Sequence, residues 1–117
     1  MNEKLKKRLL IPLHGDKYVL IKLSQLVYCE ADGNYTYYYM SDGTRYISSK
    51  NLKITADLLK DEVFYRISRS LLINLNHVES YDKTNNVVLT GNISFPVSYR
   101  NQASFHKLLK RIHYTLC

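Results

Sequence analysis

Two short tracts combine arginine with serine and lie between apolar stretches, Arg66–Ser70 (RISRS) and Ser98–Asn101 (SYRN). The guanidinium group donates two hydrogen bonds to guanine O6 and N7, a geometry that lysine does not match. Serine hydroxyls and backbone amides suit phosphate oxygens. Both tracts therefore have the chemistry of nucleic-acid binding. The alternative is structural, with Arg69 and Arg100 pairing with acids or capping carbonyls, and residue types alone leave both interpretations open.

A third tract, Tyr35–Met40 (YTYYYM), belongs to a chain with 11 tyrosines and no tryptophan. In a strand its side chains alternate between two faces. One interpretation is a platform on which unpaired bases stack, and the other is ordinary cross-strand packing. Packing is favoured for Tyr37 and Tyr39. The residues nearest the preceding turn, Asn34–Thr36, are candidates for ligand contact.

The charge of the chain is positive and unevenly distributed. Its 17 Lys and Arg against 10 Asp and Glu leave a net charge of +7. The last acid is Asp82, and five cations follow it without an opposing acid: Lys83, Arg100, Lys107, Lys110 and Arg111. This argues for an anionic partner, which nucleic acid, an anionic membrane surface or an acidic protein would each provide. A solvated basic helix explains part of the same pattern.

Several classes of catalytic site lack their motifs. The four histidines show no HxxxH or HExxH spacing. The four glycines each stand alone, so no phosphate-binding glycine-rich loop is present, and GxSxG is absent. Cys29 and Cys117 form no CxxC pair. We expect no metal, no cofactor and no enzymatic activity. The enzyme that stays open is a phosphodiester-cleaving one that uses Asp57, Asp61 and Glu62 with a divalent ion.

The length of 117 residues fits one domain. Near the start, the apolar run Leu9–Leu13 is too short for a signal-peptide core or a membrane span. We expect a cytoplasmic protein with an N-terminal tether at residues 1–8, one domain at residues 9–113, and a C-terminal tail at residues 114–117.

Short apolar segments separated by turn signals predict a mainly β fold. Pro12 places the first strand at a sheet edge, and Asp42-Gly43 is a strong hairpin signal. The predicted strands are Leu9–Leu13, Tyr18–Leu23, Leu26–Glu30, Tyr35–Met40, Arg45–Ser49, Phe64–Ile67, Leu72–Leu75, Val78–Tyr81, Val87–Thr90 and Ile93–Val97. A break is expected at Ala31–Asn34, and a turn at Ser68–Ser70.

Two segments change to a helical period. Leu52, Ala56 and Leu59 share one face of a helix of about ten residues, with Ser49 or Asn51 as its N-cap. From Asn101 onward, apolar residues recur at helical spacing opposite a basic face. The apolar positions of this closing helix are Phe105, Leu108, Leu109 and Ile112, and the basic ones are Lys107, Lys110 and Arg111.

In their order along the chain, four segments resemble the LytTR DNA-binding domains of bacterial transcriptional regulators. They are Leu26–Tyr35 (LVYCEADGNY), Leu52–Leu59 (LKITADLL), Phe64–Val78 (FYRISRSLLINLNHV) and Phe95–Asn101 (FPVSYRN). The pattern FxRxxRSxLxN followed by PVSxR is fairly specific, and the resemblance covers roughly Tyr18 to Ile112. It implies stacked antiparallel sheets, one short internal helix and an amphipathic C-terminal helix. It also implies that loops, not a recognition helix, enter successive grooves of duplex DNA.

The resemblance also implies roles for individual residues. Arg69 and Arg100 would contact bases, while Asn34, Tyr35 and Thr36 enter a neighbouring groove. The residues expected to contact phosphates are Lys50, Asn51, Ser68, Ser70, Ser98 and Asn101. The chain departs from the usual pattern at Ser68, where many members carry His, and at Tyr99, where a second Arg is common. These departures concern specificity and not the fold.

The expected partner is double-stranded promoter DNA, bound at paired direct repeats by two copies of the chain that form a dimer on the DNA. Family members usually follow a phosphorylatable receiver domain, which this chain lacks, so the chain is expected to be a freestanding regulator or the output part of a two-component response regulator. Two further hypotheses stay open. One is a single-stranded RNA or DNA binder that uses the tyrosine-rich strand, although the RNP1 pattern is absent. The other is a module that docks an acidic protein.

Overall fold

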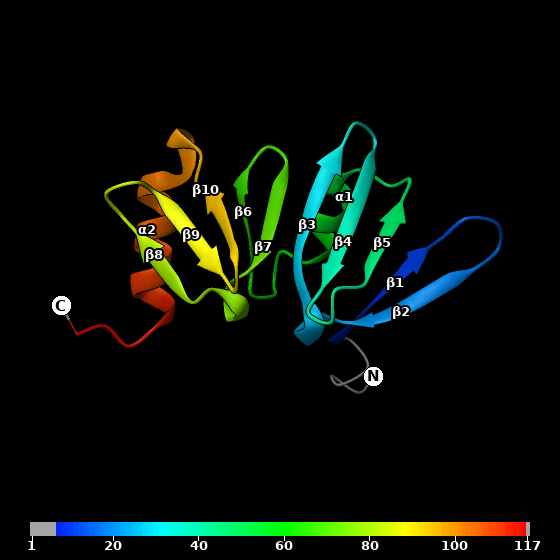
Figure 1. The fold of residues 1–117 in the computed structure, drawn as a ribbon, viewed down its shortest axis with the longest axis horizontal. Coiled ribbons are helices and arrows are strands. Elements are labelled where there is room, and N and C mark those ends of the chain that lie inside the picture. The colour runs from blue at the N-terminus through cyan, green and yellow to red at the C-terminus, as the bar shows by residue number, and fades with distance from the viewer. Residues whose placement is uncertain (1–6, 117) are drawn as a thin grey trace. The chain divides into compact units, whose positions relative to one another are not determined.

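The computed structural model describes residues 7–116, which form ten β-strands and two α-helices (Figure 1). The strands are β1 (Arg8–Pro12), β2 (Tyr18–Lys22), β3 (Leu26–Asp32), β4 (Tyr35–Met40), β5 (Arg45–Ser48), β6 (Phe64–Ser68), β7 (Leu71–Asn74), β8 (Ser80–Asp82), β9 (Val87–Thr90) and β10 (Ile93–Pro96). The helices are α1 (Leu52–Leu58) and α2 (Gln102–Ile112). Every strand pair is antiparallel. The predicted fold class, mainly β with one short internal helix and an amphipathic C-terminal helix, is confirmed.

The chain divides into two compact units, one ending at His77 and the other beginning at Val78. The first unit contains the two-stranded sheet β1-β2, the five-stranded sheet β5-β4-β3-β7-β6 and α1. The second unit contains the three-stranded sheet β10-β9-β8 and α2.

The core of the first unit joins its hairpin, its sheet and its helix. Leu9 and Ile11 alternate with exposed residues along β1, so one face of the hairpin is apolar. That face packs with residues from β3, β4 and α1, among them Cys29, Tyr38 and Leu52. Burying each large apolar side chain contributes roughly 1.5–3 kcal/mol. Burial also raises the pKa of the Cys29 thiol, which stays protonated as a core residue.

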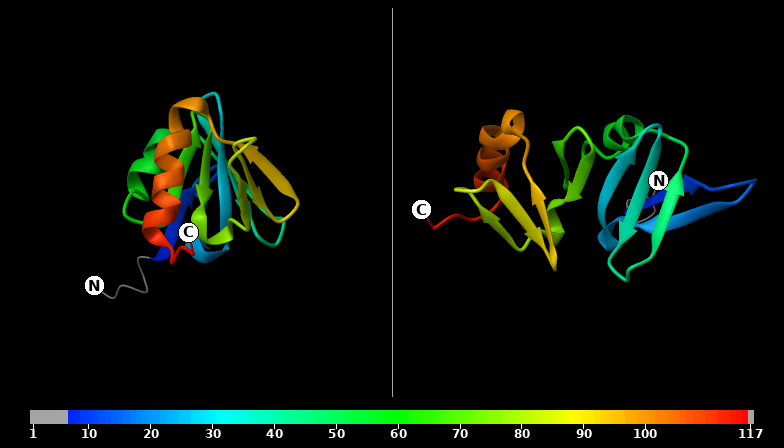
Figure 2. Two further views of the ribbon diagram at one scale, coloured as in Figure 1. Left: turned by 90° about the vertical axis from the view of Figure 1, so that its left-hand side faces the viewer. Right: turned by 45° about the horizontal axis from the view of Figure 1, so that its top comes forward.

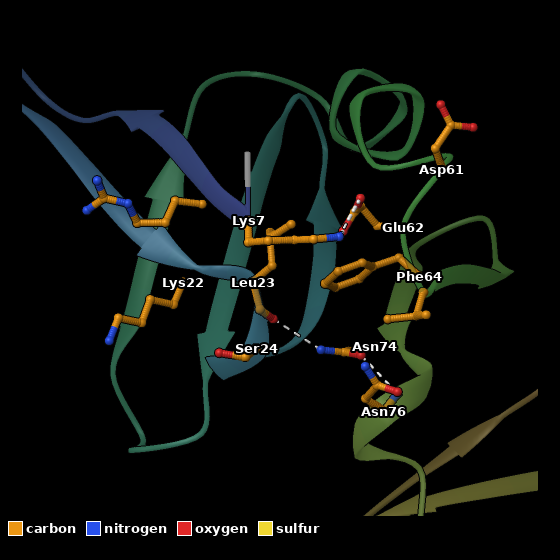
Figure 3. Close-up of a pocket in the computed structure, with 11 residues that line it drawn as sticks. Lys7, Lys22, Leu23, Ser24, Asp61, Glu62, Phe64, Asn74 and Asn76 are labelled. Carbon is orange, nitrogen blue, oxygen red and sulfur yellow. Dashed lines mark hydrogen bonds and ion pairs between the residues drawn. The ribbon is translucent and has the colours of Figure 1, made fainter. Parts of the chain in front are cut away.

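A buried asparagine holds one end of the five-stranded sheet (Figure 3). The Nδ2 of Asn74 donates to the carbonyl oxygens of Leu23 at 3.2 Å and Leu26 at 2.9 Å. Its Oδ1 accepts from the amide of Asn76 at 2.9 Å. All of these groups are paired, as buried polar groups require. Leu23, Asn74 and Asn76 line a hollow of about 610 Å³, together with Lys22.

The second unit packs α2 on its sheet, and both views in Figure 2 show the helix running alongside the strands. Phe105 of α2 is fully buried, and its ring packs edge-on against the ring of Tyr81 of β8, with 5.2 Å between the ring centroids. Val88 and Phe95 complete the apolar layer from β9 and β10. The three cations of the helix, Lys107, Lys110 and Arg111, are exposed. The predicted basic face is thus confirmed. On the predicted apolar face Phe105 is buried and Leu108 and Leu109 are half-buried, whereas Ile112 at the end of the helix is 43% exposed.

Several boundaries differ from the predicted ones. The internal helix has 7 residues instead of about ten, because Leu59 leaves the helical conformation as its C-cap. Its N-cap is Asn51 and not Ser49, since Asn51 Oδ1 accepts from the amide of Ile54 at 3.1 Å. The break predicted at Ala31–Asn34 is shorter, because β3 stays paired with β4 as far as Asp32.

The remaining differences lie near the strand ends. The strand predicted at Val78–Tyr81 is found at Ser80–Asp82, because Leu75–His77 forms a 3₁₀ turn after β7. β1 begins at Arg8, inside the expected tether at residues 1–8. Residues 1–6 of that tether, and residue 117 of the expected tail, lie outside the described part of the chain.

Candidate nucleic-acid interface

Two hairpin turns of the first unit lie side by side at one end of the five-stranded sheet (Figure 1). β3 pairs with β7, which places Glu30 opposite Leu71. Beyond this pair, the amide of Ala31 donates to the carbonyl oxygen of Ser70 at 2.8 Å. The β3–β4 turn and the β6–β7 turn are therefore held together by backbone hydrogen bonding, although they are distant in sequence.

The β6–β7 turn presents Arg69. The pairing of β6 with β7 shifts register between Arg66 and Ser68, and Ile67 at this irregularity is fully buried. Such a bulge bends a strand and redirects the side chains that follow it. Arg66 Nη2 donates to the carbonyl oxygen of Arg69 and closes the turn. The amide of Ser70 also donates to Ser68 Oγ at 3.4 Å.

The side chain of Arg69 is exposed. Within residues 7–116 the ion pairs are Lys7–Glu62 and Lys53–Asp57, so no carboxylate of that region pairs with Arg69. Its guanidinium group is thus available to an external acceptor. The alternative in which Arg69 pairs with an acid of the protein does not apply within residues 7–116.

The junction between β5 and α1 brings further predicted residues to the same end of the sheet. Ser48 pairs with Thr36 at the start of β4, and Lys50 and Asn51 follow directly. Lys50 is exposed, whereas the Oδ1 of Asn51 is used in the helix cap. Asn34 in the β3–β4 turn is exposed, and Tyr35 is 52% exposed.

Thr36 differs from the other expected contacts. Its side chain is fully buried, and its Oγ1 donates to the carbonyl oxygen of Lys50 at 2.7 Å. Strand alternation places Thr36 on the core side of β4. Its role in this structure is to anchor the segment that carries Lys50, and its buried side chain is not presented to DNA, contrary to the expectation.

The tyrosine-rich strand packs within the protein. The ring of Tyr39 stacks on that of Tyr28, with 4.3 Å between the ring centroids. The Cζ of Arg45 lies over the ring of Tyr37, 4.7 Å from its centroid. The hydroxyl of Tyr38 is hydrogen-bonded to Thr55 at 2.7 Å. Burial, followed by the charges of Tyr39 and Glu30, raises the pKa of Tyr28 to about 12. The preference for packing at Tyr37 and Tyr39 is confirmed.

The second unit carries the other arginine-bearing turn. Tyr99–Asn101 is a single 3₁₀ turn that leads into α2. Asn101 Nδ2 donates to Ser98 Oγ at 2.7 Å, and the amide of Asn101 donates to the Ser98 carbonyl at 2.9 Å. Arg100 is exposed, and no ion pair within residues 7–116 involves it.

Three residues near these turns were not expected as site residues. Arg66 closes the Arg69 turn, and its place in the RISRS tract was the available signal. Tyr99 lies beside Arg100 and is 91% exposed. The available signal was its departure from the family pattern, in which a second Arg is common at this position. Asp32 is an exposed acid in the β3–β4 hairpin, and it accepts from the hydroxyl of Tyr37 at 3.4 Å.

The acids considered for a nuclease do not converge. Asp57 pairs with Lys53 at 3.3 Å, and Glu62 pairs with Lys7 at 3.0 Å. Across the described residues, no three His, Cys, Asp or Glu side chains group together in a way that would hold a metal ion. None of the helices between residues 7 and 116 has the length and apolar character to cross a membrane.

Comparison with known proteins gives the class of the domain. The family model of the LytTr DNA-binding domain matches residues 16–110. A similar solved structure is the LytTr DNA-binding domain of a methyl-accepting/DNA response regulator from Bacillus cereus. It superimposes with a TM-score of 0.73 and 25% sequence identity, covering 89% of this chain and 97% of that chain. No curated protein matches the chain.

The fold and the family match together define a DNA-binding domain of the kind found in response regulators. The chain belongs to the LytTR DNA-binding domain family. The resemblance found in the sequence is thereby confirmed.

Proposed function

We propose that this chain binds duplex DNA sequence-specifically as the output domain of a bacterial transcriptional regulator, and that it reads bases with side chains carried on turns. The observation that carries the proposal is the Ala31–Ser70 backbone hydrogen bond of 2.8 Å. It joins two turns at one end of a sheet, where Arg69 is exposed and has no carboxylate partner within residues 7–116. Two adjacent turns on a rigid sheet are suited to entering grooves of a duplex.

The roles follow from residue chemistry. Arg69 from the first unit and Arg100 from the second each donate to a base edge, most favourably to guanine O6 and N7. Asn34 and Tyr35 contact a neighbouring groove. Lys50 supplies charge to a backbone phosphate. The remaining phosphate contacts are hydroxyl, amide and backbone donors: Asn51, Ser68, Ser70, Ser98 and Asn101.

The wider assembly is part of the proposal. The similar domain from Bacillus cereus belongs to a response regulator, which supports a regulatory input from a receiver domain outside this chain. Paired direct repeats in promoter DNA would then be occupied by two copies of the domain. Half-sites about one helical turn apart would place both copies on one face of the duplex.

Selection from randomised duplexes tests the proposal, because it measures binding and specificity together. We expect enrichment of a motif that contains guanines, and affinity that falls steeply with salt. Single strands of the enriched sequence serve as competitors. If single strands displace the protein more readily than the duplex, or if no motif is enriched, the proposal is wrong.

A further inference from the structure

The tip of the β1–β2 hairpin lies next to two segments of the candidate interface. A hollow of about 440 Å³ has Pro12–Gly15 of this hairpin on one side and Tyr35 together with Ile47–Ser49 on the other. Tyr35 and Ser49 flank the β3–β4 turn and the Lys50 segment. The hairpin tip therefore lies beside residues already placed in the interface, and Figure 1 shows it at the free end of β1 and β2.

The hairpin tip is held in a defined position. The amide of Leu13 donates to the carbonyl oxygen of Lys17 at 2.8 Å and closes the loop. Gly15 has a φ of +73°, a left-handed conformation that glycine adopts without strain. Ile11 and Ile21, which are 1% and 3% exposed, anchor the two strands in the core. A turn anchored in this way presents its side chains reproducibly.

Two exposed side chains that line the hollow carry hydrogen-bond donors, His14 a ring N–H and Ser49 a hydroxyl group. The ammonium group of Lys17 is a further exposed donor of the same hairpin turn, outside the lining of the hollow. Ammonium groups and hydroxyls are the usual partners of DNA phosphates. Asp16 in the same turn is an exposed acid and opposes an anion. Ser49 and His14 line the hollow itself, whereas Lys17 closes the base of the turn.

We propose that His14 and Ser49 bind a backbone phosphate of the DNA beside the proposed base-reading turns, and that Lys17 of the same hairpin turn adds positive charge to this part of the DNA backbone. This inference rests on the proposed function, because it adds a contact to the same DNA. The hairpin then widens the DNA segment that the domain covers and contributes affinity without sequence preference.

Binding measurements with alanine variants test the inference on the duplex obtained by selection. We expect H14A and K17A each to weaken binding roughly threefold, to the same extent on selected and scrambled duplexes. K17A should also lower the salt slope by about one unit. D16N should strengthen binding roughly twofold, because it removes an opposing charge.

The matched control is K22A, which removes an exposed lysine from the opposite end of β2. Duplexes trimmed by one base pair at a time from either end locate the contact, and the K17A penalty should vanish when one particular flank is removed. If H14A and K17A bind like K22A while the wild-type chain still selects its motif, the hairpin contact is wrong and the proposed function stands. If the wild-type chain selects no motif, both are wrong.

Discussion

Two turns of this molecule present an exposed arginine within two residues of a serine, but they are held in different ways. The β6–β7 turn with Arg69 is framed by strand pairing on both sides, by the Ala31–Ser70 bond and by the Arg66 side chain. The turn with Arg100 is a single 3₁₀ turn before a helix, closed by the bond between Asn101 and Ser98.

The difference concerns what each arginine depends on for its position. Strand register and backbone hydrogen bonds contribute most of the contacts that place Arg69, together with the side chain of Arg66. The turn with Arg100 is closed by one side-chain and one backbone hydrogen bond between Asn101 and Ser98, and substitution of either side chain removes the first of them. An exposed guanidinium group is thus held by many contacts in the β6–β7 turn and by few in the turn before α2, so we expect the second turn to be more sensitive to substitution.

The largest expected effect is the loss of either arginine. R69A and R100A should each weaken binding to the selected duplex by about 1–3 kcal/mol and relax discrimination at one base position, because each removes a proposed bidentate base contact. Equilibrium titration against single-base variants of the site measures both quantities. R8A and R111A, which remove exposed arginines on other elements, are the controls. Equal losses on selected and random DNA would contradict base reading.

The buried anchor of the first unit should come next. T36V removes the hydroxyl that donates to the Lys50 carbonyl at 2.7 Å, and it leaves that carbonyl without a partner. We expect the free energy of unfolding to fall by about 1–3 kcal/mol, measured by urea denaturation. T36S keeps the hydroxyl and should retain most of the stability. A T36V protein as stable as T36S would show that the hydroxyl does not anchor the segment.

A smaller loss of DNA affinity is expected from serine substitutions that compare the two turns directly. S98A removes the acceptor of a 2.7 Å hydrogen bond, whereas S68A removes the acceptor of a 3.4 Å one. We expect S98A to cost about 1 kcal/mol of DNA affinity and S68A only a few tenths. The double variant S98A/N101A should cost less than the sum of the two single variants, since both singles lose the same hydrogen bond while each removes its own proposed phosphate contact. Equal losses in S68A and S98A would contradict the proposed contrast.

The smallest effect concerns the β8–β9 turn, which belongs to the second unit but to neither arginine-bearing turn. Hydrogen bonds from the side chain and the amide of Asn85 lower the pKa of Asp82. A lowered pKa stabilises the fold above the ordinary carboxyl range, and this contribution is lost as pH falls through the lowered value. N85A should raise the pKa of Asp82 in an NMR titration and leave DNA binding unchanged. An unaltered pKa would mean that the side chain of Asn85 does not lower it.

Much of the fold could be predicted because its signals are local. Alternation along Tyr35–Met40, the Asp42-Gly43 turn and the helical spacing before Ile112 each depend on neighbouring residues, and the structure confirms the elements that they predicted. The turn at Ser68–Ser70 was predicted from polar residues that interrupt two apolar stretches, and the structure confirms it at Arg69 and Ser70, because β6 extends to Ser68.

The neighbours of the candidate site could not be predicted from local signals. The pairing of β3 with β7 joins segments far apart in sequence, so nothing near Ala31 indicated that it bonds to Ser70. The burial of Thr36 and the approach of His14 to Tyr35 follow from the same tertiary packing. The motif resemblance indicated candidate residues, but it did not indicate which of them are neighbours in the folded protein.

The hydrogen bond between Ala31 and Ser70 has one more consequence. It fixes the separation of two protein turns at a length that the protein cannot adjust without breaking its sheet. In the proposed binding mode, a duplex offers its contacts to the two turns at a matching interval. We therefore expect one base pair inserted between these contacts to lower the affinity even when every favoured base is retained.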